Sequence, residues 1–171
     1  ILNDDAVESV MVFANRRDIC RTLYERLKKQ GFKVGLIAGD VPQNRRMKTL
    51  DNFKNGGLKV MVATDVAGRG IHVDGVSHVV NYTLPEEPED YVHRIGRTGR
   101  AGKKGRAISL MSHDEEYLLH AIERLLDKRL PQEWLAGFEP SAKEDMVNEK
   151  HNTSPRRSSR SAEKRKLKAK L

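Results

Sequence analysis

The 171-residue chain has one cysteine and no long apolar run. Cys20 stands alone, which excludes an intrachain disulfide and a metal site built from several cysteines. No apolar stretch approaches the ~20 residues that a membrane-spanning helix needs, and no signal peptide is visible. We therefore expect a cytoplasmic protein with no membrane partner, and because the first residue is Ile1 we expect a fragment of a longer protein.

The C-terminal end is poor in acidic and apolar residues. Residues 141–171 contain ten Lys or Arg against four Asp or Glu, a net charge of +6 out of +8 for the chain, which leaves +2 for residues 1–140. Such basic segments commonly bind nucleic acid. Too little apolar surface remains there to offset the entropy cost of ordering the backbone. We predict a folded domain at 1–140 and a disordered basic tail at 141–171.

Strand and helix patterns alternate along the rest of the chain, which predicts an α/β fold with a parallel sheet. Strands are expected at residues 7–14, 32–38, 58–63, 77–82 and 106–111. Helices are expected between them, with Thr64 onward forming a loop and the arginine-rich segment near residue 94 lying on a helix. Expected buried positions of the helices are Ile19, Leu23 and Leu27, then Met47, Leu50 and Phe53, and finally Leu118, Ile122, Leu125 and Leu126, after a capping box of Ser112 and Glu115.

Residues 91–100, Tyr-Val-His-Arg-Ile-Gly-Arg-Thr-Gly-Arg, form the most informative segment. Arg94, Arg97 and Arg100 recur at every third position, with glycines between them. The planar guanidinium suits two-point contact with phosphate oxygens, and glycine lets a polyanion or another backbone approach closely. This pattern is typical of an arginine-finger segment.

Four segments together resemble the motifs of superfamily 2 helicases in their DEAD-box form. Residues 10–14, Val-Met-Val-Phe-Ala, resemble the fourth motif, and 39–46, Gly-Asp-Val-Pro-Gln-Asn-Arg-Arg, contain the Gln-x-x-Arg element. Residues 63–70, Ala-Thr-Asp-Val-Ala-Gly-Arg-Gly, resemble the fifth motif, and the arginine segment resembles the sixth. Because DEAH-type relatives usually open the sixth motif with Gln, His93 favours the DEAD-box branch. The resemblance implies a C-terminal RecA-like lobe, with a three-layer parallel sheet.

The resemblance also implies roles at the interface between two lobes. Arg97 and Arg100 are similar in position to the catalytic arginine fingers that reach the γ-phosphate of ATP. His93 is expected to bond across the cleft to the N-terminal lobe. Arg94 is expected chiefly to pair with an acidic residue such as Asp65, with a catalytic role as the alternative.

One position departs from the family pattern. Where relatives carry an aspartate that contacts the nucleotide ribose, this chain has His72, and Asp74 is the alternative source of a carboxylate. A histidine here is a variation associated with bacterial helicases of the RNA-degradosome type. Proteins of RNA degradation or ribosome assembly are therefore candidate partners.

The RNA-facing positions follow from the fifth motif and the Gln-x-x-Arg element. They are expected to contact the backbone of single-stranded or locally unwound RNA without reading its sequence. Alternatively, Thr64 only ends a strand, and Arg46 and Gln43 are surface residues of a helix. The candidate RNA-binding residues are Gln43, Arg46, Thr64, Gly68, Arg69, Gly70 and Arg16, the last standing where many relatives have threonine.

The chain has no Gly-x-x-x-x-Gly-Lys-Ser/Thr phosphate loop and no Asp-Glu-Ala-Asp run. The resemblance places both in the N-terminal lobe, which would also hold most of the Mg²⁺, so no metal site is expected in this chain. The predicted function is the second lobe of an ATP-dependent RNA helicase, inactive as a fragment. The alternatives are a non-catalytic RNA-binding or partner-docking module acting through the basic tail, and a lobe of a DNA helicase.

Overall fold

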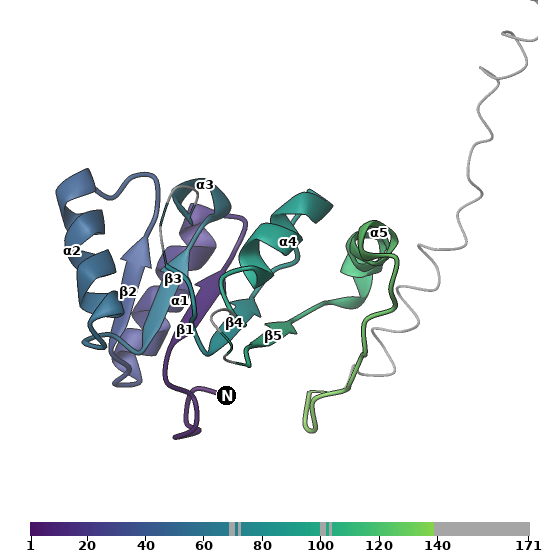
Figure 1. Cartoon of the computed structure of the whole chain (residues 1–171), viewed down its shortest axis with the longest axis horizontal. Helices are drawn as coiled ribbons and strands as arrows, with labels where there is room; N and C mark the ends of the chain where they lie inside the picture. The colour runs from purple at the N-terminus through teal and green to yellow at the C-terminus, as the bar shows by residue number, and fades with distance from the viewer. Residues whose placement is uncertain (69–70, 72, 100–101, 103, 139–171) are drawn as a thin grey trace, which may run out of the picture. The chain divides into compact units, whose positions relative to one another are not determined.

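A computed structural model describes residues 1–68, 71, 73–99, 102 and 104–138 (Figure 1). Contacts divide the chain into Ile1–Leu130 and Pro131–Leu171. The first unit carries the helices and strands of the described chain. The tail predicted at 141–171 lies outside the described residues, so its disorder and the domain boundary at residue 140 stay predictions.

The first unit is built on a five-stranded parallel sheet whose order is β2-β3-β1-β4-β5. Each predicted strand is present, and each is shorter than the sequence pattern indicated. β1 and β3 are buried along their whole length, which explains why they are continuous apolar runs rather than alternating patterns. The strands are β1 Val10–Phe13, β2 Val34–Ile37, β3 Val60–Ala63, β4 His78–Asn81 and β5 Arg106–Ser109.

Helices cover both faces of this sheet, which gives the three layers of a RecA-like fold. Side chains alternate along β1, so Val10 and Val12 pack with α1 while Met11 and Phe13 pack with α2. α1 ends before Gly31, whose positive φ of 87° favours glycine. The helices are α1 Arg17–Lys29, α2 Gln43–Lys54, α3 Asp65–Gly68, α4 Pro88–Ile95 and α5 Glu116–Leu126. No helix in the described part of the chain is long and apolar enough to cross a bilayer.

Two predicted core positions were wrong. Met47 is 46% exposed, because the inward side of α2 consists of positions 46, 49, 50 and 53, which lie about one turn apart. Leu125 is 45% exposed, and Leu119 is buried on α5 instead. Glu123 is also buried, and its carboxylate is stabilised there by a hydrogen bond from the backbone N–H of Leu130.

Two local predictions also need correction. The segment after Thr64 is a short helix, α3, rather than a loop: the Gly68 N–H donates to the Thr64 carbonyl. The helix with the arginines ends at Ile95, so that Arg94 lies on α4 whereas Arg97 follows it. The predicted capping box of Ser112 and Glu115 is confirmed, although it begins a 3-10 turn, His113–Glu115, ahead of α5.

Candidate functional site

The site is organised by an ion pair between Arg94 on α4 and Asp65 at the start of α3. Arg94 Nε donates to Asp65 Oδ1 and Nη2 donates to Oδ2, each at 2.6 Å. This two-point geometry is the strongest form of an arginine–carboxylate contact. The Arg94 side chain is 1% exposed and that of Asp65 is 19% exposed, so the guanidinium lies out of water and the carboxylate only partly so. The expected pairing of Arg94 with Asp65 is confirmed.

The rest of the Arg94 guanidinium is also satisfied by hydrogen bonds. Nη2 donates to Asn15 Oδ1 at 2.7 Å, and Nη1 donates to the Thr83 carbonyl at 2.8 Å and to Asn81 Oδ1 at 3.3 Å. The guanidinium carbon also lies 5.5 Å from the centre of the Phe13 ring. A buried charge needs this many partners to offset its lost hydration. Arg94 therefore joins segments that follow β1, β3 and β4.

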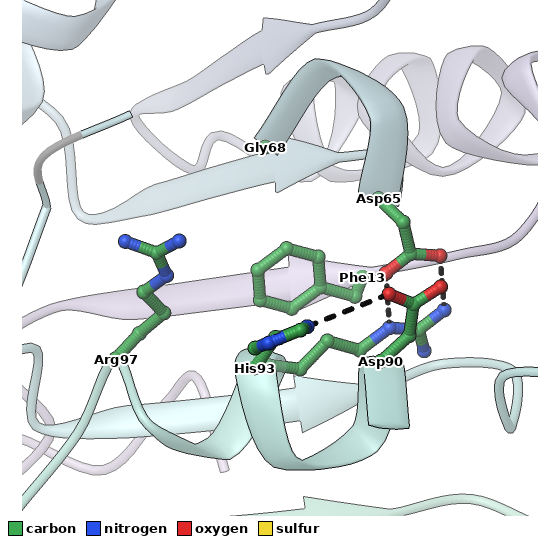
Figure 2. A pocket seen from close by; sticks show the side chains of 7 residues that line it. Phe13, Asp65, Gly68, Asp90, His93 and Arg97 are labelled. Carbon is green, nitrogen blue, oxygen red and sulfur yellow. Dashed lines mark hydrogen bonds and ion pairs between the residues drawn. The ribbon is translucent and has the colours of Figure 1, made fainter. Parts of the chain in front are cut away.

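Arg97 lies on the same side of the sheet but has a different environment. Its Nη1 donates to the Ile71 carbonyl at 2.8 Å and is 3.7 Å from Asp74 Oδ1. The side chain is 21% exposed, in contrast to that of Arg94. Figure 2 shows Arg97 standing apart from Asp65 and Asp90, on the other side of the Phe13 ring. Its guanidinium is therefore held in place by residues that follow the fifth motif, Ile71 and Asp74, and still meets solvent.

His93 points toward Asp90, one turn earlier on α4 (Figure 2). Its Nδ1 lies 3.7 Å from Asp90 Oδ1, and its side chain is 70% exposed. His93 is thus available to a group outside the described chain.

These residues line one shallow pocket. The enclosed space is about 20 Å³, enough for a single water-sized group and far too little for a nucleotide. The pocket is therefore only one wall of any larger site. It is lined by Phe13, Asp65, Gly68, Asp90, His93, Arg94 and Arg97.

The candidate RNA-facing residues of α2 and α3 lie side by side. Arg46 Nη2 donates to the Ala67 carbonyl at 2.9 Å, which joins the two helices. Arg46 Nε is buried without a hydrogen-bond partner in the described structure. Gln43, at the start of α2, is exposed.

Two other candidates from the fifth motif are buried. Thr64 is 5% exposed and its Oγ1 accepts a weak hydrogen bond from the Ala67 N–H at 3.4 Å, so it opens α3. Gly68 faces Phe13, and a Cβ there would lie 3.2 Å from the ring. Glycine therefore allows α3 to lie close to β1.

The remaining candidates divide into two groups. Arg16 is exposed and pairs with Asp18, which follows it by two residues: its Nε and Nη2 donate to the two carboxylate oxygens at 3.0 and 2.7 Å. This pair holds the Asp18 pKa below its usual value. Arg16 does not line the pocket with Arg97. The predicted residues Arg69, Gly70, His72 and Arg100 lie outside the described residues.

Sequence reasoning missed several polar partners of Arg94. Asn15, Asn81 and Thr83 had no assigned role, although each follows or ends a buried strand. For Asn15 and Asn81, a polar side chain at the carboxyl end of a parallel strand was the available signal, because such ends meet at one edge of the sheet. Thr83 accepts through its backbone carbonyl, which no residue type signals. Asp90 carried a weaker signal, its spacing of three residues from His93 on a helix. In the described ranges, no three His, Cys, Asp or Glu side chains are grouped to hold a metal ion.

Comparison with known proteins gives a consistent result. Residues 1–102 match the family described as helicase conserved C-terminal domain. The ATP-dependent RNA helicase RhlB of Pseudomonas syringae pv. tomato is 55% identical over 130 residues, which cover 76% of this chain and 33% of that protein. RhlB of Pseudomonas aeruginosa is 58% identical over 123 residues, covering 72% of this chain and 31% of that protein. The chain thus spans about a third of the length of these curated relatives.

Solved structures agree with the fold. The E. coli DEAD-box protein SrmB, solved bound to regulator of ribonuclease activity A, has 34% identity and a TM-score of 0.76, with 82% of each chain covered. A DEAD box protein from the hyperthermophile Methanococcus jannaschii has 42% identity and a TM-score of 0.69, over 76% of this chain and 36% of that one.

Proposed function

Since this chain belongs to the helicase conserved C-terminal domain family, in its DEAD-box form, we propose that it is the second RecA-like lobe of an ATP-dependent RNA helicase. In this proposal it closes against an N-terminal lobe of the same protein and supplies Arg97 and Arg100 to ATP hydrolysis. The substrate RNA is single-stranded or locally unwound. The N-terminal lobe holds most of the Mg²⁺, and the protein works in the cytoplasm on RNA that is processed, degraded or assembled into ribosomes.

The observation that carries the proposal is the contrast between two arginines of one motif. Arg94 is buried and fully bonded, whereas Arg97 is partly exposed at the edge of a pocket too small for a nucleotide. A fixed arginine beside an incomplete pocket suits a phosphate presented by another lobe. Arginine fingers of this kind accelerate phosphoryl transfer by about 10³–10⁵ because they stabilise negative charge in the transition state.

The bonded groups around Arg97 have defined tasks in this proposal. The Ile71 carbonyl and Asp74 orient the guanidinium before the lobes close, so little entropy is lost on phosphate binding. His93 faces outward to bond with the N-terminal lobe. His72 or Asp74 contacts the ribose.

The RNA contacts are proposed for the neighbouring helices. Gln43 and Arg46 of α2 and the Arg69–Gly70 segment after α3 meet the sugar–phosphate backbone, with Thr64, Gly68 and Arg16 as the further candidates. The hydrogen bond from Arg46 to the Ala67 carbonyl fixes the position of α2 relative to α3. The RNA contacts of the two helices can therefore form at the same time. Because the contacts go to backbone, the lobe binds RNA without strong sequence preference.

The test is Arg97→Ala in the whole protein that contains this chain. We expect RNA-stimulated ATP hydrolysis, measured as phosphate release, to fall by about 10³-fold or more, because the transition-state charge loses its partner. RNA affinity, measured by gel shift, should change little. Arg124→Ala, at an exposed position of α5, is the matched control and should hydrolyse ATP at the parent rate. Full turnover by Arg97→Ala would contradict the finger assignment.

The alternative, a non-catalytic RNA-binding or partner-docking module, rests on the charge of residues 141–171. Deleting them should weaken RNA affinity and flatten its dependence on salt, because fewer counterions are released. If the deletion abolishes RNA binding while Arg97→Ala leaves ATP turnover unchanged, the tail is the functional element and the motor proposal fails. Comparing RNA and DNA duplexes as unwinding substrates tests the remaining alternative, a DNA helicase lobe.

A further inference from the structure

β2 is an edge strand of the sheet. It pairs with β3 through the register Val34↔Val60 to Ile37↔Ala63, and within the described residues no strand pairs with its other side. Figure 1 shows β2 at the end of the row of strands, next to α2. An unpaired edge offers a row of backbone donors and acceptors that another strand can join.

The hydrogen bonds identify which backbone groups face outward. The carbonyl of Lys33 accepts hydrogen bonds from β3, at 3.1 Å from the Val60 N–H. Backbone groups of successive residues in a strand point to opposite sides, and a bonded residue uses both its N–H and its C=O toward the same neighbour. The N–H and C=O of Val34 and Leu36 therefore point away from β3, toward the open edge.

A groove runs along this edge between α1 and α2. Its volume is about 500 Å³, within the range of about 300–1,000 Å³ typical of ligand sites. Val34, Gly35 and Leu36 form its floor, and Leu58 and Tyr24 add apolar surface. Its polar wall comes mainly from α2 and the segment before it, with Asp40, Arg45, Lys48, Thr49 and Asn52.

The charge of this groove is positive. Arg45 and Lys48 are both exposed, and neither takes part in an ion pair within the described chain. Arg21 also lines the groove but bonds to Asp40, so these two charges cancel locally. Two cations therefore remain beside a row of backbone donors and acceptors.

We propose that this groove binds an extended acidic segment of another protein, which adds a sixth strand to the sheet at β2. The backbone of the segment pairs with Val34 and Leu36, and its acidic side chains on one face meet Arg45 and Lys48. Strand addition of this kind obtains affinity from main-chain hydrogen bonds and specificity from the alternating side chains. The lining of the groove includes none of the residues assigned to ATP or RNA, although Pro42 and Arg45 adjoin Gln43 and Arg46 in sequence.

The two other available occupants fit less well. Residues 141–171 carry a net charge of +6, so the tail of this chain would be repelled by Arg45 and Lys48. RNA matches the charge of the wall but has no regular donors and acceptors at the spacing of a strand. A peptide with alternating acidic and apolar residues satisfies both features.

The test uses the 171-residue chain and a fluorescein-labelled synthetic peptide of alternating Glu and Val. We expect saturable binding by fluorescence anisotropy. The amide hydrogen exchange of Val34 and Leu36 should slow by about tenfold or more at saturation, because their N–H groups become bonded. A peptide with Lys in place of Glu tests the charge, and one with alternate amides N-methylated tests the backbone pairing. Both should bind at least about tenfold more weakly.

A comparison of variants inside and outside the groove locates the binding site. The double variant Arg45→Glu with Lys48→Glu reverses the charge of the groove and should lower the affinity for the Glu–Val peptide by about tenfold or more. Lys54→Glu changes an exposed lysine of the same helix outside the groove and should leave the affinity within about twofold. Both variants alter exposed side chains, and equal melting temperatures would show that the fold is intact.

Three outcomes would overturn the proposal. In the first, the N-methylated peptide binds as well as the parent peptide, which would show that main-chain hydrogen bonds to β2 do not hold it. In the second, Val34 and Leu36 amides are already protected in the free chain and lose protection when residues 139–171 are deleted, which makes the groove an intramolecular site. In the third, a single-stranded oligo(U) perturbs these amides while the peptide does not, which makes the groove an RNA surface.

Discussion

Arg94, which is buried, and Asp65 form a two-point ion pair, at 2.6 Å for each hydrogen bond, that joins the sixth-motif helix to the start of α3. They are 29 residues apart in sequence. The contact fixes the base of the segment that continues to Arg97. The role of this contact in the lobe is therefore structural: it positions the segment before Arg97.

The first prediction concerns this pair. Arg94→Ala leaves the Asp65 carboxylate without its buried partner and should lower the free energy of unfolding by about 3–5 kcal/mol. Urea denaturation followed by circular dichroism measures the change. Arg94→Lys keeps the charge but cannot form the fork, so it should also destabilise the lobe. Arg124→Ala is the exposed control, and a loss for Arg94→Ala no larger than for this control would refute the structural role.

The second prediction concerns the close approach of α2 to β2. A Cβ at Gly35 would lie 2.5 Å from Thr49 Cγ2 and 2.7 Å from Leu58 Cδ1. Gly35→Ala should therefore lower the free energy of unfolding by about 1–3 kcal/mol, since the Thr49 and Leu58 side chains must move to make room. Gly39→Ala is the matched control, because nothing lies within 4 Å of its Cβ position. Thermal unfolding of the two variants should rank them in that order, and the reverse order would show that the packing at Gly35 is misassigned.

Much of the fold followed from the sequence because the central strands β1 and β3 are buried apolar runs, although every strand is shorter than the pattern indicated. The helix faces were harder. Met47 and Leu125 were expected inside, but the inward sides of these helices include Arg46 and Glu123. Arg46 donates a hydrogen bond to the Ala67 carbonyl of α3, and Glu123 accepts one from the Leu130 N–H beyond the end of α5. The periodicity of apolar residues carries no information about the hydrogen-bond partners that allow a polar side chain to be buried. The same limit explains why α3 was expected to be a loop.

The candidate site was predictable in part. The motif pattern brought Asp65, Arg94 and Arg97 together, and the structure places them around one pocket. The motif pattern did not predict the roles of Asn15 or Thr83. These roles depend on the strand order, which places β1 beside both β3 and β4. Roles at the nucleotide and the RNA stay predictions, including those of Arg69, Gly70, His72 and Arg100 outside the described residues.

The third prediction concerns Cys20, which is fully buried in α1. Burial raises the pKa of its thiol to about 11. At pH 8 roughly one thiol in a thousand is then ionised, and the thiolate is the reactive form. A disulfide reagent such as Ellman's should label the native chain far more slowly than the chain unfolded in urea at the same pH. Equal rates would contradict the burial of this side chain.

The fourth prediction concerns the acid stability of the C-terminal end of the first unit. The Leu130 N–H donates to Glu123 Oε1 at 2.9 Å and Arg129 donates to Oε2 at 2.6 Å, and these bonds hold the Glu123 pKa below its usual value near 4.5. Folding then favours the ionised carboxylate. This contribution to stability is complete above about pH 4.5 and is lost as the pH falls through the lower pKa of the folded state.

Glu123→Gln removes the titrating group and should therefore flatten the decline of stability between about pH 5 and pH 3. Urea midpoints measured across this range test the effect. Glu25→Gln, at an exposed position of α1, supplies the control and should keep the parent slope. An unchanged slope in Glu123→Gln would show that these bonds do not couple to folding.

The partners of Arg94 have a consequence for how the lobe matures during synthesis. Asn15 precedes Arg94 by 79 residues, and the other ligands of the guanidinium follow β3 and β4. Until these strands have assembled, the arginine has nowhere to dock and the segment after it has no fixed direction. A nascent or partly folded chain therefore cannot hold Arg94 or the segment that leads to Arg97 in place until its central strands come together.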